Sequence, residues 1–140
     1  PTCEAVTKMD ISGLKCGDSA GLVALMGKFA MAGVRKDETG RVQVVMCDRG
    51  EGHGEKIVDA VDFEGDVLYI KAHFDFEESV DKAYFFYSTD GMNWKQIGKA
   101  HKMIYTLEHF MGCRIGLYCY ATKETGGYAD FEYFRYTKFE

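Results

Sequence analysis

The sequence predicts an all-β fold, a sandwich of two antiparallel sheets. Segments that alternate apolar and polar residues recur roughly every 8–12 positions, with turn-forming residues between them. The chain of 140 residues contains 16 glycines and one proline, so turns are plentiful and few positions forbid strand pairing. No stretch keeps the apolar period of an amphipathic helix between two capping residues. We therefore expect helix only in short turns.

The first half of the chain contains four predicted strands. They cover residues 5–10, 20–26, 29–36 and 41–48, where apolar residues alternate with polar ones or form short runs. Gly27 and Lys28 lie between the second and third strands, where a tight hairpin turn fits. The charged segment 48–55 contains glycines but lacks the GxxxxGK[ST] or GxGxxG order of a phosphate-binding loop. We interpret it as a turn.

The second half contains the most regular patterns. Residues 67–76 alternate throughout, which places their apolar side chains on one face and their polar ones on the other. Residues 84–88 and 94–97 form the clearest hairpin, because Asp90-Gly91 between them supports the positive φ angles of a tight turn. Two longer strands, 114–121 and 128–136, are joined by a polar turn that ends in Gly126-Gly127.

Aromatic residues are concentrated between Tyr69 and Tyr136, in larger number than a small core should need. Exposed aromatic rings bind the apolar faces of sugar rings, while nearby polar side chains bind the hydroxyl groups. The candidate carbohydrate-binding residues are Trp94, Tyr87, Tyr118, Tyr120, Tyr128 and Arg114. The alternative for each aromatic residue is ordinary packing in the core or against a turn.

The alternation of side chains along a strand indicates which of these aromatic residues share a face. Tyr118 and Tyr120 share a strand face with Arg114, opposite the aliphatic face of Ile115 and Leu117. If the aliphatic face is the core, these tyrosines point outward. In the run from Tyr84 to Tyr87, Phe85 and Tyr87 form one set, but the pattern leaves open which set is buried.

Length, charge and cysteine content exclude several classes of protein. A chain of this length fits one domain, and its formal net charge of −5, with scattered Lys and Arg, argues against nucleic acid or an anionic membrane as a partner. No apolar run approaches the roughly 18 residues of a membrane span. The five cysteines are an odd number without CxxC spacing, which favours buried thiols over a zinc site or a disulfide framework. Because the sequence begins at Pro1, we expect a piece excised from a larger protein.

No pattern of reactive residues indicates catalysis. Glycosidases need two carboxylates at a defined separation, and no spacing selects a pair among the candidates Asp75, Glu77, Glu78, Asp130 and Glu132. The serines, cysteines and four dispersed histidines occur in no nucleophile motif. We expect no catalytic site, no cofactor and no catalytic metal. A structural Ca²⁺ at Asp130 and Glu132 remains an alternative, although no DxDxDG loop exists.

An ordered set of motifs resembles the C-terminal β-sandwich module of family 43 glycoside hydrolases, the β-xylosidases and α-L-arabinofuranosidases. The motifs are Ser-Thr-Asp-Gly-Met-Asn-Trp at 88–94, Ile-Gly at 97–98, His-Phe-Met-Gly at 109–112, Arg-Ile-Gly-Leu at 114–117 and the segment 126–134, with 20–25 and 33–36 matching earlier strands. The resemblance runs from about residue 2 to 136. It implies a concanavalin A-like jelly roll, and modules of this kind have been grouped with xylan-binding modules. It also implies that His109 and Phe110 belong to a loop that brings an aromatic residue to the active site of a companion catalytic domain.

The sequence therefore predicts a single non-catalytic module, residues 1–140, that binds xylan or arabinoxylan-type hemicellulose through exposed aromatic residues. The alternative is a structural accessory domain that docks on a family 43 catalytic propeller and completes its active site without binding sugar itself. The expected partners are xylan or a xylo-oligosaccharide and the companion catalytic domain, with an extracellular location favoured if polymeric xylan of plant cell walls is the target. Two departures from the family pattern are expected: a start partway through the module and no propeller sequence.

Overall fold

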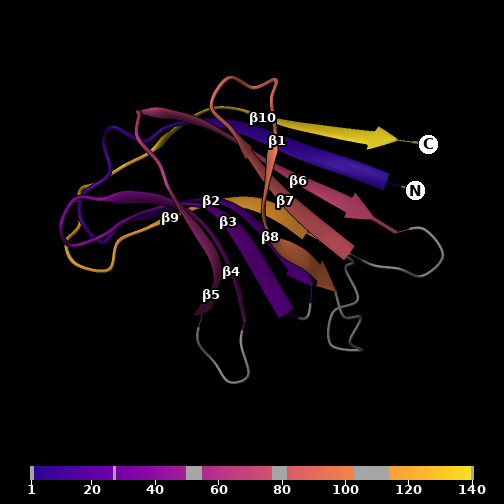
Figure 1. Ribbon diagram of the computed structural model, residues 1–140, viewed down its shortest axis with the longest axis horizontal. Helices are drawn as coiled ribbons and strands as arrows, with labels where there is room; N and C mark the ends of the chain where they lie inside the picture. Colours follow the sequence, from indigo (N-terminus) through magenta and orange to yellow (C-terminus); the bar gives the residue numbers. More distant parts are fainter. Residues whose placement is uncertain (1, 27, 50–54, 77–81, 103–113, 140) are drawn as a thin grey trace.

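The computed structural model describes residues 2–26, 28–49, 55–76, 82–102 and 114–139, and these form two antiparallel five-stranded sheets (Figure 1). Sheet A has the strand order β10-β1-β6-β7-β8, and sheet B has the order β5-β4-β3-β2-β9. The strands are β1 (Thr2–Asp10), β2 (Ser19–Met26), β3 (Lys28–Lys36), β4 (Val42–Arg49), β5 (Glu55–Asp62), β6 (Val67–Asp75), β7 (Lys82–Ser88), β8 (Lys95–Lys102), β9 (Arg114–Tyr120) and β10 (Asp130–Phe139). The prediction of an all-β sandwich is confirmed. Within the described ranges there is no helix of a length and apolarity suited to crossing a membrane.

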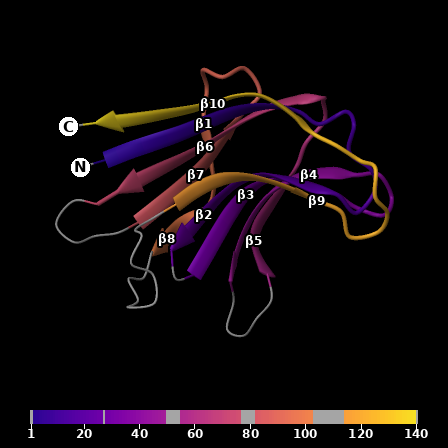
Figure 2. The same cartoon turned by 180° about the vertical axis from the view of Figure 1, so that it is seen from behind.

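The two sheets pack face to face and enclose the core. β8 lies against β4 and β5, β7 against β3, and β6 against β2. β10 and β9 are edge strands at the opposite side of the sandwich (Figure 2). β1 and β10 pair from Thr2↔Phe139 to Asp10↔Asp130, so the first and last strands lie side by side. The edge strand β8 therefore contacts sheet B at one side of the sandwich, whereas the edge strands β10 and β9 lie at the other.

Residues 67–76 alternate between the core and the outer face, as their sequence pattern predicted. Leu68, Ile70, Ala72 and Phe74 of β6 are buried in the main hydrophobic cluster, whereas the residues between them are half-buried on the outer face of sheet A. β7 follows the same rule. Phe85 is fully buried and Tyr87 packs against the core, so this set of the aromatic run from Tyr84 to Tyr87 is the inner one.

The hairpin of β7 and β8 has the turn chemistry that its sequence predicts. Gly91 adopts φ 78°, and the carboxylate of Asp90 accepts hydrogen bonds from the backbone N–H groups of Met92 and Asn93, both at 2.8 Å. The Ser88 hydroxyl donates to Asp90 at 2.9 Å. These three groups, together with the side-chain amide of Asn93, hold the pKa of Asp90 well below its ordinary value, the backbone N–H of Asn93 contributing most.

β5 is a strand that the sequence pattern did not predict. Its pairing with β4 shifts register between Met46 and Cys47, so a bulge breaks the alternation of apolar residues along the strand. Ile57 and Val58 consequently stand next to each other in the sequence, which hides the period of two. Of the turns predicted at Gly27-Lys28 and at 48–55, Gly27 and residues 50–54 lie outside the described residues, whereas Lys28 begins β3 and positions 48, 49 and 55 belong to β4 and β5.

Candidate functional site

The outer face of sheet B carries two tyrosines from edge strand β9. Ile115 of β9 packs against the core, and the alternating positions Tyr118 and Tyr120 therefore point to the opposite face, as the aliphatic pattern predicted. Their ring centroids are 5.9 Å apart, with an interplanar angle of 33°. The two rings form a short, tilted aromatic surface beside β2.

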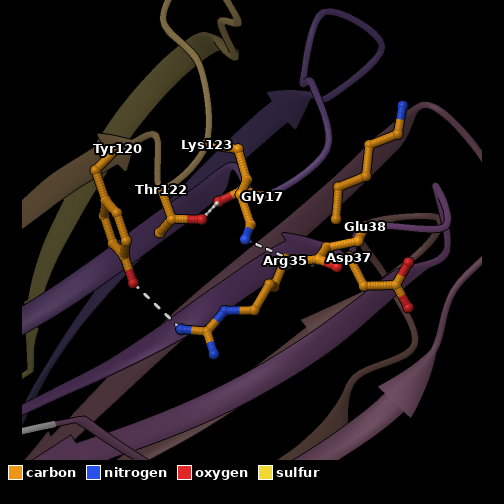
Figure 3. A pocket seen from close by; sticks show the side chains of 8 residues that line it. Gly17, Arg35, Asp37, Glu38, Tyr120, Thr122 and Lys123 are labelled. Atoms are coloured by element: carbon orange, nitrogen blue, oxygen red, sulfur yellow. Dashed lines mark hydrogen bonds and ion pairs between the residues drawn. The ribbon is translucent and has the colours of Figure 1, made fainter.

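Tyr120 borders a cavity of about 520 Å³ at one end of this face (Figure 3). Its lining residues are Gly17, Arg35, Lys36, Asp37, Glu38, Tyr120, Thr122 and Lys123. Strand pairing brings Tyr120 of β9, Ser19 of β2 and Arg35 of β3 into one row across the sheet. The volume is within the range of about 300–1,000 Å³ that small-ligand sites occupy.

Arg35 is held in this row by its neighbours on both sides. Its Nε donates to the Ser19 hydroxyl at 3.2 Å. Its Nη2 donates to the Tyr120 hydroxyl, also at 3.2 Å, and Figure 3 shows this second bond. Guanidinium groups are planar and carry five N–H donors, so these contacts fix the plane of the fork. The result is a positively charged hydrogen-bonding group at the cavity, next to an aromatic ring.

Charged side chains at the rim are engaged with one another. Lys123 forms an ion pair with Glu38 at 2.6 Å, and this contact lowers the pKa of Glu38 and raises the pKa of Lys123. The hydroxyl of Thr39 donates to Asp37 at 2.7 Å and holds the pKa of that carboxyl below its ordinary value. A glycosidase acid needs a raised pKa. These two carboxyl groups have the opposite shift, which suits hydrogen bonding at the cavity rather than proton donation.

An apolar cluster continues the same face beyond Tyr118. Met31, Val45 and Cys47 are buried there, with Val23, Phe29 and Tyr118 packed against them. Gly21 and Gly33 lie between Tyr118 and Val45 in the strand register. A Cβ on Gly21 would collide with the carbonyl oxygen of Ala32, so β2 and β3 approach more closely than a side chain would allow. The face is thus polar at Tyr120 and apolar from Tyr118 onward.

The other candidate residues lie apart from this site. Trp94 is on the outer face of sheet A, where the Lys71 ammonium is 4.4 Å from the centroid of its ring and the Tyr69 ring approaches edge-on at 6.5 Å. Tyr87 packs against the core. Tyr128 is 59% exposed, and its backbone N–H donates to Gly13 at 3.0 Å.

Arg114 is exposed at the start of β9, on the face that also carries Tyr118 and Tyr120. His109 and Phe110 lie outside the described residues. The sequence thus predicted the two tyrosines and Arg114 on one face but missed Arg35 and Ser19. Arg35 lies within the predicted strand 29–36 and Ser19 directly precedes the predicted strand 20–26, but only the pairing of three strands places them beside Tyr120.

The carboxylates weighed for calcium or catalysis are dispersed. Glu132 forms an ion pair with Lys8 at 3.0 Å, and Asp130 is exposed at the start of β10. Glu77 and Glu78 lie outside the described residues. No group of three or more His, Cys, Asp or Glu side chains suited to a metal ion occurs in the parts of the chain that the structure covers.

Comparison with known proteins gives one consistent family. Residues 1–137 match the family model of the β-xylosidase C-terminal concanavalin A-like domain. A β-xylosidase of Formosa agariphila is 34% identical over 135 residues, which cover 96% of this chain and 21% of that enzyme.

Solved structures agree with the sequence match. A bifunctional GH43-CE protein of Bacteroides eggerthii has 47% identity and a TM-score of 0.92, over 100% of this chain and 18% of that one. A GH43 protein of Bacillus licheniformis, at 21% identity and a TM-score of 0.79 over 96% of this chain and 27% of that one, shows the shared fold. The chain thus spans between about a fifth and a quarter of these relatives. On this evidence it belongs to the family of C-terminal concanavalin A-like domains of family 43 glycoside hydrolases.

Proposed function

We propose that this chain is a non-catalytic accessory module that binds neutral xylan or arabinoxylan-type chains along the outer face of sheet B. The observation that carries the proposal is the row Tyr120, Ser19 and Arg35 beside a cavity of about 520 Å³. Tyr118 extends the aromatic surface from the cavity along β9.

The chemistry of this row suits a neutral sugar chain. Tyrosine rings offer flat apolar area for the C–H face of a pyranose, and the Arg35 guanidinium and Tyr120 hydroxyl line the space where sugar hydroxyls would lie. Arg114, on the same face of β9, gives a further donor along the path of a longer chain. Family membership supports the substrate class, because the Formosa agariphila relative is a β-xylosidase.

Affinity electrophoresis of the 140-residue chain in gels that contain soluble xylan tests this function. Tyr120→Ala should weaken retardation about tenfold, which corresponds to about 1.4 kcal/mol, in line with other aromatic contacts. Tyr120→Phe keeps the ring and loses the hydroxyl, so it should weaken retardation less. Tyr84→Ala, on the outer face of sheet A, is the matched control and should migrate as wild type.

Two results would contradict the proposal. Folded wild-type chain that xylan does not retard would show that the isolated module has no such site. Equal retardation of wild type and Tyr120→Ala would place any site on another face. A thermal melt of each variant distinguishes lost binding from lost folding.

A second candidate function is docking on a catalytic domain, and exposed apolar side chains favour it. Leu117, Tyr128, Phe134, Tyr136 and Phe139 are each between 39% and 59% exposed, and all lie on β9, β10 or the turn between them. Phe134 and Tyr136 pair with Thr7 and Ala5, so they belong to the inner face of sheet A, at its edge. A cavity of about 90 Å³ lined by Cys3, Phe74, Phe76, Ile115 and Tyr136 lies nearby.

An exposed apolar edge of this kind is typical of a surface that another domain covers. The test is Phe134→Ser in the full-length parent enzyme, with Phe139→Ser, on the outer face of the same strand, for comparison. Docking through the inner edge predicts a lower Tm and lower kcat/KM on a xylosidic substrate for Phe134→Ser only. Equal effects of the two variants would contradict it. Phe110→Ala in the same enzyme tests the expected active-site role of that loop residue by its kcat/KM.

A further inference from the structure

The outer face of sheet A carries a set of alternating cationic and aromatic side chains, which we call the cation–aromatic face. Its members are Lys8, Tyr69, Lys71, Phe86, Trp94, Tyr133 and Arg135. They come from β1, β6, β7, β10 and the turn before β8. Strand alternation puts them there, because the residues between them in β1 and β6 point into the core.

Lys71 is at the centre of this face. Its ammonium lies 4.4 Å from the Trp94 centroid and 5.0 Å from the Phe86 centroid. The Tyr69 ring meets the Trp94 ring edge-on at 6.5 Å, and Lys8 lies 5.6 Å above the centre of Tyr69. The ammonium is therefore half-enclosed by aromatic walls instead of extending freely into water.

Cation–aromatic contacts of this kind are concentrated on one face of the molecule. The described residues contain four, and all four lie on this one face.

Ion pairs engage part of the charge on this face, but neither Lys71 nor Arg135 has one among the described residues. Glu132 forms an ion pair with Lys8 at 3.0 Å, and Glu4 contacts His73 at 3.0 Å. Asp75 lies at the far end of β6, opposite Lys82 in the strand pairing. Within the described ranges, the Lys71 ammonium has neither an ion pair nor a hydrogen bond with another residue; its contacts are the two rings.

We propose that the cation–aromatic face binds a glycan that carries uronic acid, with its carboxylate on the Lys71 ammonium and the adjoining sugar ring against Trp94 and Phe86. A carboxylate supplies the missing anion, and a pyranose ring supplies the apolar C–H face that aromatic walls accept. A neutral sugar would have to displace the ammonium from the Trp94 ring without replacing its charge interaction. The choice of a glycan as ligand rests on the proposed function of the module. The site itself is separate, because it lies on sheet A, whereas the row of Tyr120, Ser19 and Arg35 lies on sheet B.

Trp94 is the single tryptophan of the chain, so its fluorescence reports directly on this site. The probe is a xylo-oligosaccharide with one glucuronic acid substituent, and the control ligand is the neutral oligosaccharide of the same length. We expect saturable change of Trp94 fluorescence with the acidic probe alone, because its carboxylate draws the ammonium away from the indole. Raising the salt concentration to about 0.5 M should weaken the binding.

Two variants of Lys71 separate charge from shape. Lys71→Met keeps an unbranched apolar side chain and loses the charge, so its affinity for the acidic probe should fall at least about tenfold. Lys71→Arg keeps the charge and a cation that can lie over the aromatic rings, so it should stay within about threefold of wild type. Thermal melts of both verify folding, and isothermal titration calorimetry gives affinities that do not depend on the fluorophore.

Several results would overturn the proposal. The first is that neither fluorescence nor calorimetry detects binding of the acidic probe. The second is that the acidic and neutral oligosaccharides bind with equal affinity. The third is that folded Lys71→Met binds the acidic probe as tightly as wild type. An equal response to polyglutamate would show that the face binds an acidic peptide through charge alone, which also overturns it. Loss of neutral xylan binding in Tyr120→Ala is a separate outcome, because that variant leaves Lys71 and Trp94 intact.

Discussion

Adjacent phenylalanines in β7 allow a direct test of which side of sheet A is the core. Phe85 is fully buried, pairs with Ile97 of β8 and belongs to the main hydrophobic cluster. Phe86 is half-buried on the outer face, where its ring lies 5.0 Å from the Lys71 ammonium. The two residues have the same side chain and the same strand environment, so only the face distinguishes their Ala variants.

The expected losses differ several-fold. Truncation of a fully buried Phe to Ala costs about 4 kcal/mol in free energy of unfolding, from lost apolar transfer and the remaining cavity. Phe86→Ala removes a ring that is only half-buried and one cation–π contact, which together contribute about 1 kcal/mol. With an unfolding entropy of about 0.3 kcal/mol/K for 140 residues, the Tm should fall by about 14 °C for Phe85→Ala and about 3 °C for Phe86→Ala.

Urea denaturation followed by far-ultraviolet circular dichroism measures both losses in the same units. Circular dichroism is preferred to fluorescence because Trp94 lies beside Lys71, which contacts Phe86. If Phe85→Ala does not fold, Phe85→Leu keeps most of the volume and should still lose more stability than Phe86→Leu. Equal losses, or a larger loss at Phe86, would refute the assignment of the faces.

Two further predictions concern turns and pH. Hydrogen bonds hold the pKa of Asp90 below its unfolded value of about 3.9, so its carboxylate stabilises the fold above that pH, and this stabilisation is lost as pH falls toward the folded-state pKa. The stability difference between wild type and Asp90→Asn should therefore be full near neutral pH and shrink below about pH 4. A constant difference in urea titrations at several pH values would contradict this. Gly98 (φ 76°) and Gly40 (φ 88°) both have left-handed backbones, but a Cβ on Gly98 would collide with Met46 Sδ, whereas one on Gly40 would meet nothing within 4 Å. In chemical denaturation, Gly40→Ala should lower the free energy of unfolding by about 1 kcal/mol, and Gly98→Ala should lower it by about 2 kcal/mol more. Similar losses in the two variants would show that the Met46 side chain moves aside freely.

The sequence predicted those parts of the fold in which local alternation is uninterrupted. β6 was predicted with its inner and outer faces, and the Ile115 side of β9 correctly identified Tyr118 and Tyr120 as outward-facing. β5 was missed because a bulge opposite Met46 and Cys47 breaks its period. Local pattern carries no information about such a shift, since it arises from pairing with β4.

The candidate sites were only partly predictable for the same reason. Arg35 meets Tyr120 because β2 lies between β3 and β9, an order that no segment encodes by itself. Trp94 was predicted as a possible platform, but the Lys71 side chain that covers its ring comes from β6, more than twenty positions away in the chain. Tyr87 belongs to the same alternating run as Phe85, and the pattern could not decide between the two faces.

The pairing of β1 with β10 has a consequence for synthesis. β1 is an interior strand of sheet A, bordered by β6 on one side and by the edge strand β10 on the other. During translation, β6 reaches β1 after about sixty residues, but β10 is the last described strand to leave the ribosome. Until then one flank of β1, with its unpaired N–H and C=O groups, is open to strands of neighbouring nascent chains. Slow translation of residues 114–139 should therefore increase aggregation of this module more than slow translation of any earlier segment.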